Sequence, residues 1–173
     1  MKKLFLLVIL FSVIATLSGC NKNVGEISGV QNIKKEDIFN QKEDEYFVYF
    51  HRLDCEDCEA SKPYVIEYAQ ILKDYEGCSG KRKIYSVLLY TSKEKPDEEI
   101  LIYREYSGED GQGTDGKFYV DGKTDWKDLY IASTSSLISI STVSGVKKAY
   151  YTSQGVEGVK EKLTTQMGNC YLK

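Results

Sequence analysis

The chain has no excess of basic residues, and this absence restricts the partners it can bind. Its 23 Lys and Arg residues are outnumbered by 26 Asp and Glu residues, and the formal net charge is −3. Binding to nucleic-acid phosphates requires a basic face, so we expect no nucleic-acid partner. The short basic clusters at 81–83 and 147–148 are expected to lie on the solvated surface.

The chain also lacks an apolar stretch long enough for a typical membrane-spanning helix. The longest stretch runs from Leu4 to about Leu17, whereas a transmembrane helix needs roughly 20 apolar residues. Lys2 and Lys3 precede it, and its length suits the apolar core of a signal peptide. We therefore expect residues 1–19 to be an export signal.

The end of this segment, Leu17-Ser18-Gly19-Cys20, resembles a bacterial lipobox. The resemblance implies that residues 1–19 are removed and that Cys20 is lipidated, which anchors the protein on the extracytoplasmic face of the cell membrane. Stable anchoring requires more than one acyl chain, each buried CH₂ contributing about 0.8 kcal/mol. A simple cleaved signal or an uncleaved anchor is the alternative. Residues 20–32 are then a polar tether and 33–173 the folded domain.

Two ligand-binding patterns lack the context that their ligands require. Gly111–Gly116 fits G-x-G-x-x-G, but no strong strand precedes it and no helix opens on it, which argues against a nucleotide. Asp110 and Asp115 lie in the same loop, but the full ligand series and the terminal Glu of an EF-hand are missing. We expect neither a metal nor a cofactor.

Two cysteines three residues apart, Cys55 and Cys58, are the most informative feature that is present. They follow a strand-like run, Tyr46–Phe50, and precede a helix-like run. A helix N-terminus carries partial positive charge and stabilises a thiolate, which is the nucleophile in disulfide exchange. Zinc is the rival ligand, but structural zinc usually needs four ligands, and the other thiols are isolated in the sequence. The pattern predicts a redox dithiol.

These residues resemble the thioredoxin-like superfamily. Phe50 lies five residues before Cys55, as the strand-ending Phe of that family does, and Pro63 matches its helix proline. The segment Thr134–Ile138 is similar to the family segment that faces the active site. The similarity spans roughly residues 33–170. It implies an α/β three-layer sandwich with a central mixed sheet, helices on both faces, and an insertion at about 91–130.

Local patterns add the remaining elements. Apolar spacing predicts a helix through Tyr64–Tyr75, and Ile84–Tyr90 is expected to be a central buried strand. The family resemblance adds a hairpin around Ser144-Gly145 and a last helix from about Val156 to Met167. Phe118–Val120 suggests a short strand before a turn.

The chain departs from the family pattern in two ways. It has only 2 prolines, and Ser135 stands where the family has a cis-proline. A non-prolyl cis bond costs about 2.5–4 kcal/mol, so we expect a trans Thr134–Ser135 bond. A carboxylate about 6 Å from an anion in water opposes it by roughly 0.7 kcal/mol, comparable to the contribution of a helix terminus. We therefore expect a weakly acidic Cys55, because the nearby residues are Asp54, Glu56, Asp57 and Glu59.

The resemblance also implies how the cysteines divide. Without Cys20, four remain: Cys55 would attack and Cys58 would resolve. In a thioredoxin-like topology the ends of the helix after the dithiol and of the last helix are neighbours, which predicts a structural disulfide between Cys78 and Cys170. Two unpaired thiols are the alternative.

Together these features predict a membrane-anchored, extracytoplasmic thiol–disulfide oxidoreductase that is reducing or weakly oxidising. Its expected partners are the thiols or disulfides of exported proteins, together with a separate redox donor protein. The alternative is a non-enzymatic accessory lipoprotein, for example of the bacteriocin-export type, whose domain binds an exported protein or peptide. His51, the only histidine, is expected to be an exposed loop residue, with assistance in proton transfer as the other interpretation.

The lipobox generates the first testable prediction. Replacing Cys20 by Ala removes the thiol that would carry the lipid, so the protein should be released from membranes or stall as a precursor. Membrane fractionation with mass spectrometry of the mature N-terminus measures both effects. Wild-type levels of Cys20→Ala on membranes, with an unmodified Cys20 in the native protein, would contradict it.

Overall fold

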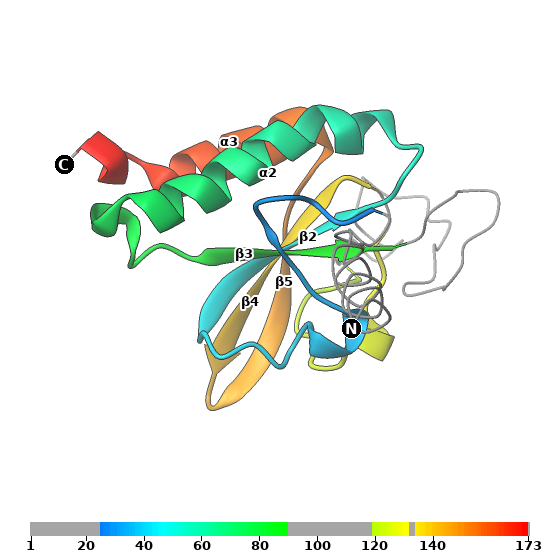
Figure 1. The fold of residues 1–173 in the computed structure, drawn as a ribbon. Helices are drawn as coiled ribbons and strands as arrows, with labels where there is room; N and C mark the ends of the chain where they lie inside the picture. Colours follow the sequence, from blue (N-terminus) through cyan, green and yellow to red (C-terminus); the bar gives the residue numbers. More distant parts are fainter. Residues whose placement is uncertain (1–24, 90–118, 132–133, 173) are drawn as a thin grey trace, which may run out of the picture.

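The computed structural model describes residues 25–89, 119–131 and 134–172. The expected signal peptide, Cys20 and most of the expected insertion lie outside the described residues. Within them the chain is an α/β protein with an open, mixed five-stranded sheet, compatible with a thioredoxin-like sandwich (Figure 1).

The sheet has the strand order β1-β3-β2-β4-β5. Strand β2 lies at its centre, parallel to β3 and antiparallel to β4, while β5 pairs with β4 in an antiparallel hairpin that turns at Ser144-Gly145. The strand expected at 84–90 is β3, an interior strand that pairs with β1 on one side and with β2 on the other. The strands span Gln31–Asn32 (β1), Glu45–His51 (β2), Lys83–Leu88 (β3), Ser136–Val143 (β4) and Val146–Gln154 (β5).

Strand β2 divides its side chains between two hydrophobic cores. Successive side chains of a strand point to opposite faces of the sheet. Tyr46, Val48 and Phe50 accordingly pack into one core, and Phe47 and Tyr49 into the other. All five are fully buried, which is why the run reads as continuously apolar and aromatic in the sequence.

Among the described residues, helices α2 and α3 lie side by side on one face of the sheet (Figure 1). Helix α2 spans Glu56–Asp74 and helix α3 spans Gly155–Met167, so the helices predicted after the dithiol and at the end of the chain are both present. Their buried residues complete the core that contains Phe47 and Tyr49: Val65, Tyr68, Val159 and Leu163.

The opposite face is covered, within the described ranges, by short 3-10 helices and loops. Helix η2 spans Lys35–Asp37 and helix η4 spans Trp126–Asp128. The residue that follows each, Ile38 or Leu129, is buried in the core that contains Tyr46, Val48 and Phe50. The helices predicted on this second face are therefore single 3-10 turns. Val120 is also buried in this core, but it lies in a turn rather than in the predicted short strand.

The predicted boundary between tether and domain at residue 33 is wrong. Ile27 and Val30 are only 1% and 7% exposed and pack against the helical face of the sheet, and Gln31–Asn32 form the edge strand β1. The Asn32 side chain accepts from Ile27 N and donates to the carbonyls of Ile27 and Val30. Two apolar residues among polar and Gly neighbours resemble a linker in sequence, and only the packing reveals them as core.

Cys78 and Cys170 are joined by a disulfide at the end of the molecule remote from the N-terminus of α2. Cys78 ends the 3-10 helix η3 (Glu76–Cys78) that follows α2, and Cys170 begins η5 (Cys170–Leu172) after α3. Their Cα atoms lie 5.1 Å apart, within the range that a disulfide requires. The packing of the two helices thus brings residues 92 positions apart into contact.

This bridge generates a stability prediction. Closing a loop of 92 residues should contribute about 4–5 kcal/mol in the chain-entropy model. The double variant Cys78→Ala/Cys170→Ala should therefore lose several kcal/mol of unfolding free energy in denaturant titrations. Cys55→Ala/Cys58→Ala, which opens a loop of three residues, is the matched control and should lose less. Equal losses in the two double variants would contradict the prediction.

Candidate functional site

The Cys55–Cys58 pair lies where the central strand meets the first helix. Strand β2 ends at His51, and α2 begins at Glu56 with Cys55 as its N-cap in an extended conformation. The Cys55 Sγ accepts a hydrogen bond from Cys58 N at 3.1 Å, which satisfies one of the unpaired amides of the first turn. The two cysteines form a disulfide with their Cα atoms 5.2 Å apart.

The two sulfur-bearing residues differ slightly in their access to solvent. Cys55 is 5% exposed and Cys58 is fully buried. Cys55, at the helix start, is thus the only one of the pair with any exposure to solvent.

Two of the four acidic residues around the dithiol are paired with basic side chains, which offset their electrostatic effect on it. Glu59 pairs with Lys62 at 2.5 Å, and Asp54 pairs with Arg52 at 2.5 Å. Glu56 and Asp57 are exposed to water, which screens them. The acidity that the sequence predicts is present, but its opposition to a thiolate is weaker than four unpaired carboxylates would give.

Thr134 and Ser135 lie beside the dithiol. Thr134 Oγ1 is 3.4 Å from Cys55 Sγ, and Ser135 is fully buried. The expectation of a trans bond between them is wrong, because the Thr134–Ser135 peptide bond is cis. A contact with a distant segment holds Ser135 in place: Ser135 O accepts a hydrogen bond from Gly155 N at 2.8 Å, at the point where β5 passes into α3. The local sequence does not reveal this contact.

Arg52 is a component of the site that the sequence did not reveal. Its Nε donates to Thr134 Oγ1 at 3.2 Å, and its Nη1 donates to Leu53 O at 3.3 Å and to Asp54 O at 2.9 Å. Only 15% of the side chain is exposed. Arg52 and Thr134 are 82 positions apart, so no local sequence pattern connects them.

His51 is the last residue of β2 and not an exposed loop residue, so that prediction is wrong. It is only 2% exposed, and its ring stacks on Tyr49 with centroids 5.7 Å apart. Burial lowers the pKa of His51 to about 4, and the nearby positive charge of Lys62 acts in the same direction. Within the described part of the chain its Nε2 has no hydrogen-bond partner. The imidazole is therefore neutral at physiological pH.

A buried hydroxyl network connects the helix start to the sheet. Tyr49 OH and Ser61 Oγ are 2.7 Å apart, and Tyr49 OH also donates to Cys58 O at 3.4 Å. Ser61 Oγ lies 2.6 Å from Asp57 O. Burial raises the pKa of Tyr49, so the phenol stays protonated and continues to donate. These contacts fix the first turns of α2, and with them Cys58, against β2.

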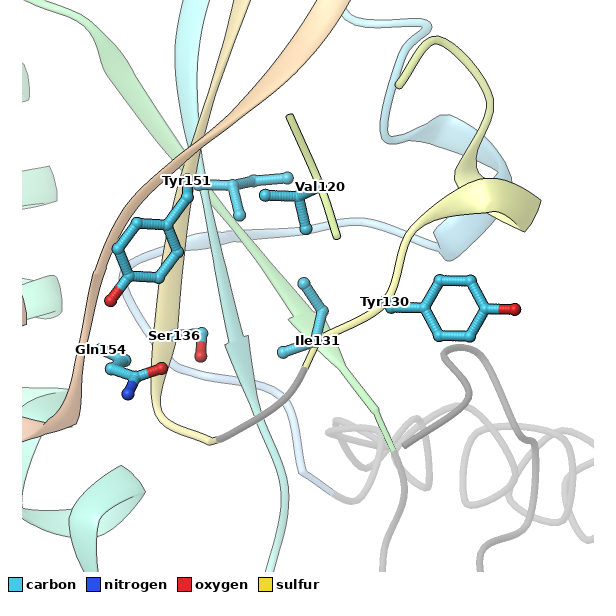
Figure 2. A pocket seen from close by; sticks show the side chains of 7 residues that line it. Val120, Tyr130, Ile131, Ser136, Tyr151 and Gln154 are labelled. Atoms are coloured by element: carbon cyan, nitrogen blue, oxygen red, sulfur yellow. The ribbon is translucent and has the colours of Figure 1, made fainter. Parts of the chain in front are cut away.

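A small hollow lies on the face of the sheet opposite α2 (Figure 2). Ser136 and Gln154 border it near the strand ends, Val120 and Ile131 close it from the loop side, and the Tyr130 ring points away (Figure 2). Its volume of about 10 Å³ holds roughly one water molecule. It is too small to bind a ligand.

No group of three or more His, Cys, Asp or Glu side chains that could hold a metal occurs in residues 25–89, 119–131 and 134–172. None of the helices in these ranges has both the length and the apolarity to cross a bilayer. Comparisons with protein-family models, with curated proteins and with solved structures find no match to the chain.

The buried His51 generates a pH prediction. The unfolded chain binds a proton at His51 below about pH 6.5, whereas the folded chain does so only near pH 4. Because the unfolded state binds more protons in this window, stability is full above pH 6.5 and is lost as the pH falls toward 4, by up to about 3 kcal/mol. His51→Phe keeps a stacked ring without the titration, so its unfolding free energy should depend less on pH in this window.

Glu43 provides the matched control. Desolvation opposes the shift, but hydrogen bonds from Lys83 and Tyr85 lower the pKa of Glu43 to about 2. Its contribution is therefore lost between about pH 4.5 and 2, below most of the His51 window. Denaturant titrations of Glu43→Gln should keep the slope above pH 4.5 that His51→Phe loses. Equal slopes in wild type and His51→Phe would refute the assignment.

Proposed function

We propose that this chain is a thiol–disulfide oxidoreductase of the thioredoxin-like superfamily, with Cys55 and Cys58 as its redox pair. The observation that carries the proposal is the disulfide at the N-terminus of α2, directly after the central strand and beside Thr134. The helix terminus favours a Cys55 thiolate. The partial access of Cys55 and the full burial of Cys58 fit an attacking and a resolving cysteine, respectively.

The chemistry proceeds through two exchanges. In the reducing direction the Cys55 thiolate attacks one sulfur of a client disulfide, forms a mixed disulfide, and releases the other client sulfur as a thiolate that takes up a proton. The Cys58 thiol then loses its proton and attacks Cys55 Sγ, which releases the second client thiolate. Two electrons pass to the client, its two thiolates take up the Cys58 proton and one proton from water, and the Cys55–Cys58 bond forms. A donor dithiol restores the reduced pair by the same steps in reverse.

The proposed direction is reducing or weakly oxidising. Glu56 and Asp57 are negative charges in the first turn of α2, and they offset part of the stabilisation that the helix terminus gives to a thiolate. A less stable thiolate makes the dithiol a better reductant. The ion pairs of Asp54 and Glu59 limit this effect, so the potential is expected between those of strong reductants and strong oxidants.

The proposed location is the extracytoplasmic face of the cell membrane, with Cys20 lipidated. The support is the sequence of residues 17–20 after a basic and apolar segment. The clients are then thiols or disulfides of exported proteins, and a separate redox protein is the electron donor.

The low exposure of Cys55 favours a second candidate. A disulfide that is 5% exposed at one cysteine and buried at the other is also what a purely structural bridge requires. In that case the domain is an accessory lipoprotein that binds an exported protein or peptide without redox turnover. Reduction of insulin by the protein, with a dithiol as electron source, distinguishes the two candidates.

Trapping of the mixed disulfide tests the proposed function. Cys58→Ala removes the resolving thiol, so clients should accumulate on Cys55 as complexes that a reducing agent dissolves. Cys55→Ala should trap none, and neither should the double variant. Non-reducing electrophoresis of cell extracts, followed by mass spectrometry, measures the complexes. If Cys58→Ala captures nothing and the purified wild-type protein neither reduces nor oxidises insulin, the accessory-protein candidate takes its place.

A further inference from the structure

Arg52 connects the two sides of the site. It lies in the turn between β2 and α2, and its Nη1 donates to the backbone carbonyls of Leu53 and Asp54 and to the Asp54 carboxylate. Asp54 has a left-handed φ of 48°, a conformation that Asp adopts more readily than most residues. This turn brings the backbone carbonyl oxygen and one carboxylate oxygen of Asp54 to Nη1 of the guanidinium, while Nε donates to Thr134.

The Thr134 hydroxyl lies between Arg52 and Cys55. A guanidinium has only donors, so Thr134 Oγ1 must be the acceptor of the 3.2 Å bond from Arg52 Nε. The same oxygen is 3.4 Å from Cys55 Sγ. A cysteine thiolate has no hydrogen of its own, so in the reduced protein any bond at this contact has Thr134 as its donor. An arginine that fixes the hydroxyl oxygen therefore holds it where its hydrogen can reach the sulfur.

We propose that Arg52 is a positioning residue for disulfide exchange: it holds the Thr134 hydroxyl against Cys55 Sγ, where the hydroxyl stabilises the thiolate released on reduction. This inference rests on the proposed redox role of Cys55. When an external dithiol reduces the pair, two electrons break the Cys55–Cys58 bond and the dithiol becomes a disulfide. Of the two protons that the dithiol releases, Cys58 takes one and water takes the other, so Cys55 remains a thiolate. Hydrogen bonds to a charged acceptor are about twice as strong as neutral ones, so the contact favours the reduced form.

The surrounding charges leave the Thr134 hydroxyl as the main route by which Arg52 stabilises a Cys55 thiolate. Arg52 is mostly shielded from solvent, but its charge is matched by Asp54, so its influence on Cys55 comes chiefly through the oriented hydroxyl. The exposed carboxylates of the first helical turn oppose the thiolate through water. Among the described residues, the charged side chains of the turn and of the first two turns of α2 are Arg52, Asp54, Glu56, Asp57, Glu59 and Lys62.

The redox equilibrium of the full chain tests the proposal. The protein is equilibrated in glutathione buffers, alkylated, and analysed by peptide mass spectrometry for the fraction of oxidised Cys55–Cys58. Arg52→Gln and Thr134→Val should each lower the equilibrium constant for reduction about tenfold, which is about 30 mV for a two-electron couple. Because both changes remove the same contact, the double variant should shift little beyond either single variant.

Two further variants make the test specific. Thr134→Ser keeps the hydroxyl and should hold more of the wild-type potential than Thr134→Val. Arg82→Gln removes another partly exposed arginine, paired with Glu45 at 3.1 Å near the opposite end of β2, and should not shift the potential. Thermal unfolding identifies variants that do not fold. If Arg52→Gln does not fold, the comparison of Thr134→Ser with Thr134→Val still tests the hydroxyl contact.

Three results would overturn the proposal: an unchanged potential in folded Arg52→Gln, additive shifts in the double variant, or equal potentials for Thr134→Ser and Thr134→Val. The measurement needs no client protein. Failure of insulin reduction therefore counts against the proposed function, whereas the potentials of these variants decide the role of Arg52 independently.

Discussion

The burial of β2 on both faces is the constraint on which the rest of the structure depends. Its backbone pairs with β3 on one side and β4 on the other, and its side chains supply both cores. A strand held in this way has no freedom to shift its register, because a shift by one residue would exchange its two faces. The turn that follows is therefore fixed in space, and with it the start of α2 and the Cys55–Cys58 pair.

The sequence predicted the features that depend on neighbouring residues. The strand before Cys55 and the helix after it follow from local patterns, while the hairpin at Ser144-Gly145 and the last helix followed from the family resemblance, and the structure has each of them. The mixed sheet was predicted from the resemblance to the thioredoxin-like superfamily, and the structure has it.

The features that the sequence missed depend on contacts between distant segments. Arg52 meets Thr134 across 82 positions, and nothing near either residue indicates the other. His51 follows five apolar or aromatic residues and precedes a charged turn, so the local sequence fits either a strand or a loop. The packing of its ring on Tyr49 makes it the last residue of the strand. Ile27 and Val30 become core only because α2 and β3 provide a surface for them.

The position of the second disulfide has a kinetic consequence for the disulfide exchange proposed above. Helix α2 has 19 residues and is about 28 Å long at 1.5 Å per residue, and it separates the Cys55–Cys58 pair from Cys78 and Cys170 at its other end. Exchange requires direct contact between sulfur atoms, and both Cys78 and Cys170 are buried. The rigid helix thus insulates the bridge that holds the fold together from attack by the thiolate of its own chain, so the two disulfides can follow independent redox histories.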